Sequence, residues 1–202
     1  MTQKKSYFTI YRVAFIAVMA AVVYVLTLFR FPFLGSKVHF ANAMCLLSGL
    51  LFGPVGGGLA AGLGSGLYDL LNGYGIDEAL ITTVSKFLMA AICAWIAGPR
   101  RMGALPAEGA TFREHYSALW KSAPRIIVGS VVGALSYVAL YMLKTFVYQR
   151  FVYGVPMETV WATMLSKLPA SLINALFAMI VAPVLYAAIL PPLRKAGVTG
   201  KL

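Results

Sequence analysis

The sequence predicts an all-α integral membrane protein with six transmembrane helices. Of its 202 residues, 60% are apolar and only 11% are charged, whereas a soluble domain is about half apolar and a quarter charged. The mean hydropathy is +0.82. Most basic residues lie in short segments between long apolar runs. These observations exclude a disordered chain, a secreted disulfide scaffold and most soluble enzymes.

Six apolar segments are long enough, or nearly so, to cross a hydrocarbon core of ~30 Å, which needs ~20 helical residues. The predicted spans cover residues 8–29, 40–53, 57–72, 79–98, 124–147 and 159–190. A turn at FGPVGGG, residues 52–58, separates the second span from the third. Pro191 and Pro192 are expected to end the sixth. The chain is therefore expected to be a single transmembrane domain over residues 1–202.

The charge distribution predicts the orientation of these spans. An even number of spans places both termini on one side of the membrane. Eleven basic residues then share that side, and only Arg30, Lys37 and Arg150 lie on the other. Since cytoplasmic loops carry the excess of lysine and arginine, both termini are expected in the cytoplasm. The same distribution accounts for the formal net charge of +11 without a nucleic-acid partner.

Motifs typical of catalysis and of cofactor binding are missing from the sequence. It contains no G-x-x-x-x-G-K-[ST] loop for nucleotide phosphates. His39 and His115 lie on opposite sides of the membrane in the predicted topology, so they cannot share a metal ion. Cys45 and Cys93 lie inside apolar runs without C-x-x-C spacing, and we expect buried free thiols. The sequence therefore predicts no catalytic residue, no metal site and no cofactor.

Small residues recur at the spacing that lets transmembrane helices pack closely. We interpret one set as internal packing positions: Gly58, Gly62, Gly66, Gly129 and Gly133. Ala14, Ala17 and Ala21 form a similar row on the first span. That row fits internal packing or a docking face for another membrane subunit, and spacing alone leaves both interpretations open.

Four ionisable residues lie inside the predicted spans: Asp69, Lys86, Lys144 and Lys167. Charged groups are costly in hydrocarbon and mark a functional site by default. All four fall in the outer halves of their spans, which predicts one polar cluster across four helices. Two alternatives stay open. Lys144 could extend to the membrane surface, and Asp69 could pair with Lys86 or Lys167 only to hold helices together.

Polar and aromatic neighbours extend this cluster at helical spacing. Tyr137 and Tyr141 share a stripe with Lys144, Ser171 and Asn174 share one with Lys167, and Asn42 opens the second span. We predict an outward-facing ligand cavity with aromatic walls. The candidate binding residues are Asn42, Asp69, Lys86, Tyr137, Tyr141, Lys144, Lys167, Ser171 and Asn174. Three lysines against one aspartate favour a ligand with an anionic or strongly accepting group.

Two segments resemble a known transporter family. NAMCLLSGLLFGPVGGGLAAGLGSGLYDLL, residues 42–71, and KLPASLIN, residues 167–174, are similar to substrate-binding S components of energy-coupling-factor (ECF) vitamin transporters, most of all the riboflavin-type branch. The resemblance covers essentially the whole chain. It implies six helices and an outer binding cavity capped by loops, with residues 30–39 as part of the lid.

The resemblance also implies a function, partners and a location. The chain would be a high-affinity, membrane-embedded substrate-binding subunit of an ATP-driven importer in the bacterial plasma membrane, and not an enzyme. Its partners would be a transmembrane coupling subunit and two cytosolic ATPases, with Ala17 and Ala21 matching the family's A-x-x-x-A docking spacing. The ligand would be riboflavin or a similar small heterocycle. An anionic vitamin such as pantothenate, or action as a self-sufficient facilitator, are the alternatives.

Overall fold

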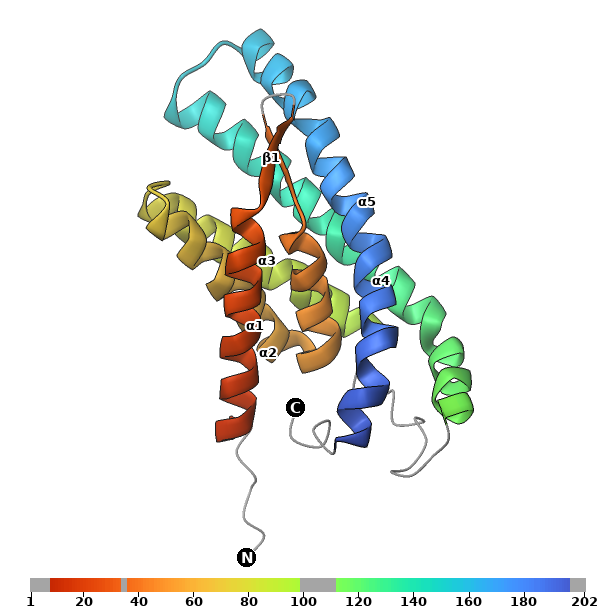
Figure 1. The fold of residues 1–202 in the computed structure, drawn as a ribbon. Helices are drawn as coiled ribbons and strands as arrows, with labels where there is room; N and C mark the ends of the chain where they lie inside the picture. The colour runs from red at the N-terminus through yellow and green to blue at the C-terminus, as the bar shows by residue number, and fades with distance from the viewer. Residues whose placement is uncertain (1–7, 34–35, 99–111, 197–202) are drawn as a thin grey trace, which may run out of the picture.

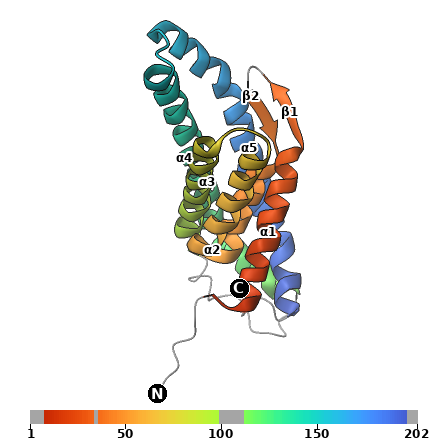
Figure 2. The ribbon, with the colours of Figure 1, turned by 90° about the vertical axis from the view of Figure 1, so that its left-hand side faces the viewer.

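The computed structural model describes residues 8–33, 36–98 and 112–196, and all structural statements concern these residues. The elements in chain order are α1 (Ile10–Leu28), β1 (Arg30–Phe33), β2 (Ser36–His39), α2 (Ala41–Leu71), α3 (Ile76–Ala97), α4 (Phe112–Val147), the π-helical turn η1 (Tyr148–Val152) and α5 (Met157–Lys195). The hairpin of β1 and β2 lies at one end of the bundle. The start of α1 and the end of α5 lie at the other end (Figures 1 and 2).

Five helices of the described chain are long and apolar enough to cross a membrane. Many of their large apolar side chains are exposed, as they would be in lipid. In the most apolar stretch of α2, 72% of the residues are buried, against 17% to 33% in the other four helices. Since α2 also contacts α1, α3, α4 and α5, it is the central element of the bundle.

The α2 helix reverses direction inside the segment where the sequence predicts a turn. Gly53 has a φ of 77° and breaks the helix just before Pro54. Ser48 Oγ donates a 2.9 Å hydrogen bond to the Gly57 carbonyl. Cys45 Sγ lies 3.9 Å from Ser65 Oγ, although a straight helix would separate these residues by ~30 Å. Two arms of α2 therefore pack against each other.

The first arm of α2, residues 41–52, extends ~18 Å at 1.5 Å per residue. That length is shorter than the ~30 Å hydrocarbon core. The five long helices and the reversal in α2 are compatible with the predicted arrangement, but the number of crossings stays a prediction. The orientation of the termini also stays a prediction.

The glycines pack internally, as their spacing predicts. A Cβ added at Gly58 would lie 2.7 Å from the Phe87 ring, and one at Gly62 would lie 2.7 Å from the Thr83 carbonyl oxygen. Gly129 and Gly133 make comparable approaches from α4 to the opposite half of α3. These positions allow the helices to touch backbone to backbone. The expected buried free thiols, Cys45 and Cys93, are also confirmed.

Two local expectations about secondary structure are wrong. The all-α class must be amended, because residues 30–33 and 36–39 form an antiparallel hairpin that pairs Arg30 with His39. The last helix does not end at Pro191 and continues to Lys195. The Ala196 amide donates to the Pro192 carbonyl, so helical hydrogen bonding resumes after the two prolines. Each proline removes only one donor near the end of the helix.

Candidate functional site

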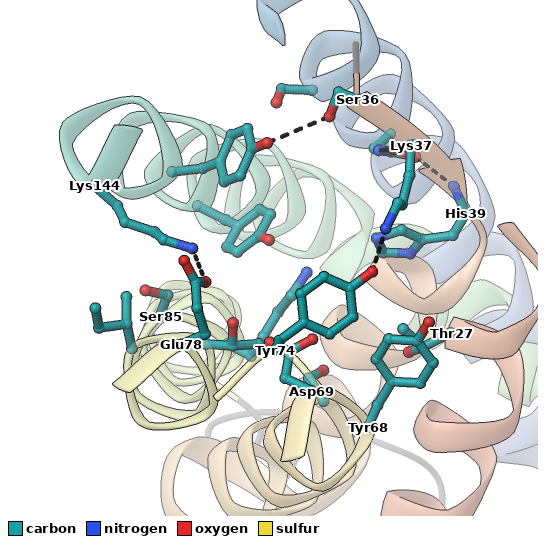
Figure 3. Close-up of a pocket in the computed structure, with 18 of the residues that line it drawn as sticks. Thr27, Ser36, Lys37, His39, Tyr68, Asp69, Tyr74, Glu78, Ser85 and Lys144 are labelled. Atoms are coloured by element: carbon teal, nitrogen blue, oxygen red, sulfur yellow. Dashed lines mark hydrogen bonds and ion pairs between the residues drawn. The ribbon is translucent and has the colours of Figure 1, made fainter. Parts of the chain in front are cut away.

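A cavity of about 330 Å³ lies between the hairpin and helices α1, α2, α3, α4 and α5. Its size falls within the range of small-molecule sites, about 300–1,000 Å³. Figure 3 shows polar side chains converging on it from several elements that are distant in sequence. The cavity therefore forms where the fold brings together residues from both halves of the chain.

All but one of the predicted binding residues line this cavity. The lining residues from the predicted set are Asp69, Lys86, Tyr137, Tyr141, Lys144, Lys167, Ser171 and Asn174. Asn42 lies behind them, where its Oδ1 accepts a hydrogen bond from Lys86 Nζ. The lining residues outside the predicted set are Thr27, Arg30, Ser36, Lys37, His39, Ser65, Tyr68, Tyr74, Glu78, Ile81, Thr82 and Ser85. Their role in binding stays a proposal.

Lys86 is the most deeply buried cation of the cavity, with 3% of its surface exposed. Its Nζ donates to Asn42 Oδ1 and lies 3.5 Å from the centroid of the Tyr137 ring. A cation above an aromatic face is attracted by the ring quadrupole. None of the ion pairs between described residues involves Asp69, so the expected alternative of a structural Asp69 salt bridge is wrong here. Among the described residues, the Lys86 ammonium is held by an amide oxygen and an aromatic ring and forms no ion pair.

Lys144 points into the site and forms an ion pair with Glu78 (Figure 3). The two side chains are 19% and 25% exposed, so the pair is partly shielded from water. A second link, the 2.8 Å hydrogen bond from the Tyr148 hydroxyl to Asp77 Oδ2, also joins α4 to α3. Lys144 therefore ties two helices together, and its extension to the membrane surface stays a prediction.

The hairpin is tied down beside the cavity. Arg30 Nη1 donates to the Tyr74 hydroxyl at 2.6 Å, and Lys37 Nζ donates to the same oxygen. Burial alone would raise the pKa of Tyr74, but the hydrogen bonds and positive charge of Lys37 and Arg30 hold it below its ordinary value. The Ser36 and Tyr141 hydroxyls, 3.3 Å apart, add a link to α4. The hairpin is thus bonded to two different walls of the site.

Asn174 attaches β2 to α5. Its Oδ1 accepts the His39 backbone N–H at 2.8 Å, and its Nδ2 donates to the Lys37 carbonyl at 2.8 Å. Both ends of the amide are therefore engaged with the hairpin. The structure places Asn174 as a positioning residue for β2, although it also lines the cavity.

The site offers no arrangement for metal binding among the described residues, where no cluster of three or more histidine, cysteine, aspartate or glutamate side chains occurs. Its chemistry is that of recognition. Aromatic faces, ammonium groups, hydroxyls and one ion pair line the cavity. Such a combination binds a small molecule with an apolar ring and several hydrogen-bonding groups.

Comparisons with known proteins identify the fold and the family. A family model described as "ECF-type riboflavin transporter, S component" matches residues 7–190. The chain belongs to this family. S components are transport-binding subunits and not enzymes. The resemblance in residues 42–71 and 167–174 is therefore confirmed.

A solved structure titled "Structure and mechanism of the S component of a bacterial ECF transporter" shares the fold. The TM-score is 0.58 at 19% sequence identity, over 91% of this chain and 97% of that chain. A search of curated proteins gave no match. As an S component, the chain is a membrane-embedded substrate-binding subunit of an ECF transporter.

Proposed function

We propose that this S component binds riboflavin in the cavity beside the hairpin. The observation that carries the proposal is Lys86, a buried ammonium held between Asn42 and the Tyr137 ring at the cavity wall. Riboflavin has a flat, neutral ring system with two carbonyls on one edge. Tyrosine rings suit its faces, and a lysine ammonium suits its carbonyls. The riboflavin-type family description supports the same ligand.

We further propose that the cavity opens to the outside of the bacterial plasma membrane. The basic residues at the start of α1 and the end of α5 support this orientation, because cytoplasmic ends carry the excess of positive charge. The hairpin then lies on the outer side. Six crossings with both termini in the cytoplasm complete the proposed topology.

ATP-driven partners are also part of the proposal. Ala14, Ala17 and Ala21 are exposed on α1, whereas Ile16 and Val23 are its buried residues. The alanines therefore do not pack inside this subunit. An exposed row of small residues allows a second helix to approach closely. We propose that a transmembrane coupling subunit docks there and is driven by two cytosolic ATPases.

The first test is mass spectrometry of small molecules released from the detergent-purified chain, followed by a riboflavin titration monitored by flavin fluorescence. We expect saturable binding at one riboflavin per chain. Tyr137→Leu should weaken it, and the matched variant Tyr153→Leu, which changes a tyrosine that is 63% exposed, should not. Absence of riboflavin binding by the unmodified chain would contradict the proposal.

A second candidate ligand is an anionic vitamin such as pantothenate. The supporting observation is the charge of the lining, which contains five lysine or arginine side chains and two carboxylates. A competition experiment separates the candidates. Displacement of riboflavin only by flavins supports the first, and stoichiometric pantothenate binding supports the second. Uptake into vesicles by the chain alone, without ATP or partner subunits, would instead support a self-sufficient facilitator.

A further inference from the structure

Two polar atoms on the hairpin side of the cavity have no hydrogen-bond partner. They are Nδ1 of His39 and the hydroxyl oxygen of Tyr68, and both are shielded from water. Both residues line the cavity. Nearly all buried polar atoms in folded proteins are paired, and an unpaired one destabilises the fold unless something else satisfies it. Both atoms therefore have hydrogen-bonding capacity that a ligand in this cavity can use.

The position of the Tyr68 hydroxyl is fixed by the packing of its ring. Tyr68 is 3% exposed on α2. Its ring centroid lies 6.0 Å from that of Tyr24, and the Arg30 guanidinium lies 5.3 Å above the ring. In Figure 3 Tyr68 and Thr27 lie on the hairpin side, across the cavity from Lys144 and Glu78. The neighbouring Thr27 hydroxyl already donates to the Val23 carbonyl, so it competes little for a ligand.

His39 is held at the same side by β2. Its backbone N–H is fixed by Asn174 Oδ1. Burial, with the positive charges of Lys86, Arg30 and Lys37, lowers the pKa of His39 to about 3. The imidazole is therefore neutral at neutral pH, with one nitrogen that donates and one that accepts. Nδ1 is therefore either a donor or an acceptor, and in the structure it has no hydrogen-bond partner.

We propose that His39 Nδ1 and the Tyr68 hydroxyl form a subsite for hydroxyl groups of the ligand, and that this subsite holds the ribityl chain. A hydroxyl both donates and accepts, so ligand hydroxyls can pair with each of these atoms whichever imidazole nitrogen carries the proton. A ring carbonyl only accepts, and the ammonium of Lys86 is its better partner. This inference rests on the proposed function and adds that the subsite recognises the ribityl chain of the ligand.

The test compares riboflavin with lumiflavin, which has the same ring system and a methyl group in place of the ribityl chain. Kd values are measured for the unmodified chain, Tyr68→Phe, His39→Leu and the control Tyr153→Phe. Tyr68→Phe keeps the packed ring and removes only the hydroxyl. We expect each cavity variant to bind riboflavin up to about tenfold more weakly, which is the effect of one hydrogen bond. Lumiflavin binding should change less than about twofold.

Each outcome decides the inference. A selective loss of riboflavin affinity in both cavity variants, with Tyr153→Phe unchanged, supports the subsite. Equal losses for the two flavins, or no loss, overturn the subsite and leave riboflavin binding in place. If the unmodified chain binds neither flavin, the proposed function fails and the subsite fails with it. Melting temperatures of all variants show whether a loss arises from unfolding.

Discussion

The two halves of the α3–α4 pair differ in how closely the helices approach. In one half, a Cβ added at Gly133 would lie 2.8 Å from the Met89 carbonyl oxygen and 2.8 Å from Cys93 Cβ, so the backbones are in contact. In the other half, the same helices present Lys86, Tyr137 and the Lys144–Glu78 pair to the cavity. Glycines close the first half, and long polar side chains line the second. The size of the side chains along one helix pair therefore determines where a cavity can form.

The largest expected effect is a wedge in the closed half. Gly133→Val places a branched side chain against the Met89 carbonyl and Leu46 Cδ2. Overpacking of this kind costs about 1–3 kcal/mol, which corresponds to a fall of about 2–12 °C in melting temperature for a chain of this size. The measurement is thermal unfolding of the purified protein in detergent.

The control for this wedge is Ala139→Val, which adds bulk at an exposed position of the same helix. It should melt within about 1–2 °C of the unmodified chain, since surface changes are usually within ±0.5 kcal/mol. Equal melting temperatures for the two variants would show that the close contact at Gly133 does not hold the pair together.

The next largest effect concerns ligand affinity in the open half. Lys86→Met removes a buried ammonium and retains most of the side-chain volume. We expect about 10- to 100-fold weaker riboflavin binding, because hydrogen bonds to charged groups contribute about 1.5–3 kcal/mol. The empty protein should not be destabilised much, since burying an unpaired cation is itself costly. Titration and melting of the same preparation measure both quantities.

Lys121→Met is the control for the loss of a lysine charge. Lys121 is exposed on α4 and does not line the cavity, whereas Lys86 is buried on α3. It should leave affinity and melting temperature unchanged. A large fall in the melting temperature of Lys86→Met with unchanged riboflavin affinity would contradict the role of Lys86 in binding. Lys86 would then hold the open half together, and the cavity would not be the riboflavin site.

Breaking the ion pair across the open half should have a smaller effect. Glu78→Gln leaves Lys144 without its carboxylate. Since the side chains are 19% and 25% exposed, we expect a loss of about 1 kcal/mol at low salt that shrinks as salt screens the pair. Melting temperatures at low and high salt measure it, with the exposed Glu158→Gln as control. A salt-independent loss would mean that packing, and not charge, joins the helices there.

Most of the fold could be predicted from the sequence, because hydrophobic length and glycine spacing act locally. The turn at FGPVGGG appears as the break at Gly53. The hairpin could not be predicted in this way. Its strands have four residues each, too few for an alternating pattern to emerge. Their stability comes from β1–β2 pairing and from contacts with distant residues such as Asn174.

The candidate site was predicted where charges lie inside apolar spans. A lysine such as Lys86 is conspicuous there, because hydrocarbon excludes it. Glu78 and Tyr74 lie at or near helix ends, where polar residues are common and carry no such signal. Only the fold brings Glu78 to Lys144, 66 residues away, and Tyr74 to Arg30, 44 residues away. The place of His39 in the site could not be predicted either, because the groups around it come from distant parts of the chain, such as Lys86 and Asn174.

The remaining prediction concerns acid loosening of the hairpin that borders the open half. The folded chain keeps His39 neutral down to about pH 3, whereas an unfolded chain takes up the proton near pH 6.5. The unfolded state thus binds more protons between these values, and stability present above pH 6.5 is lost as the pH falls toward 3. The positive charges that face His39 and oppose its protonation are those of Lys86, Arg30 and Lys37. Faster hydrogen exchange of the β2 amides at pH 5 than at pH 7, after correction for intrinsic rates, should disappear in His39→Phe. If the acid effect persists in that variant, another group opens the hairpin, and the difference between the closed and open halves does not depend on His39.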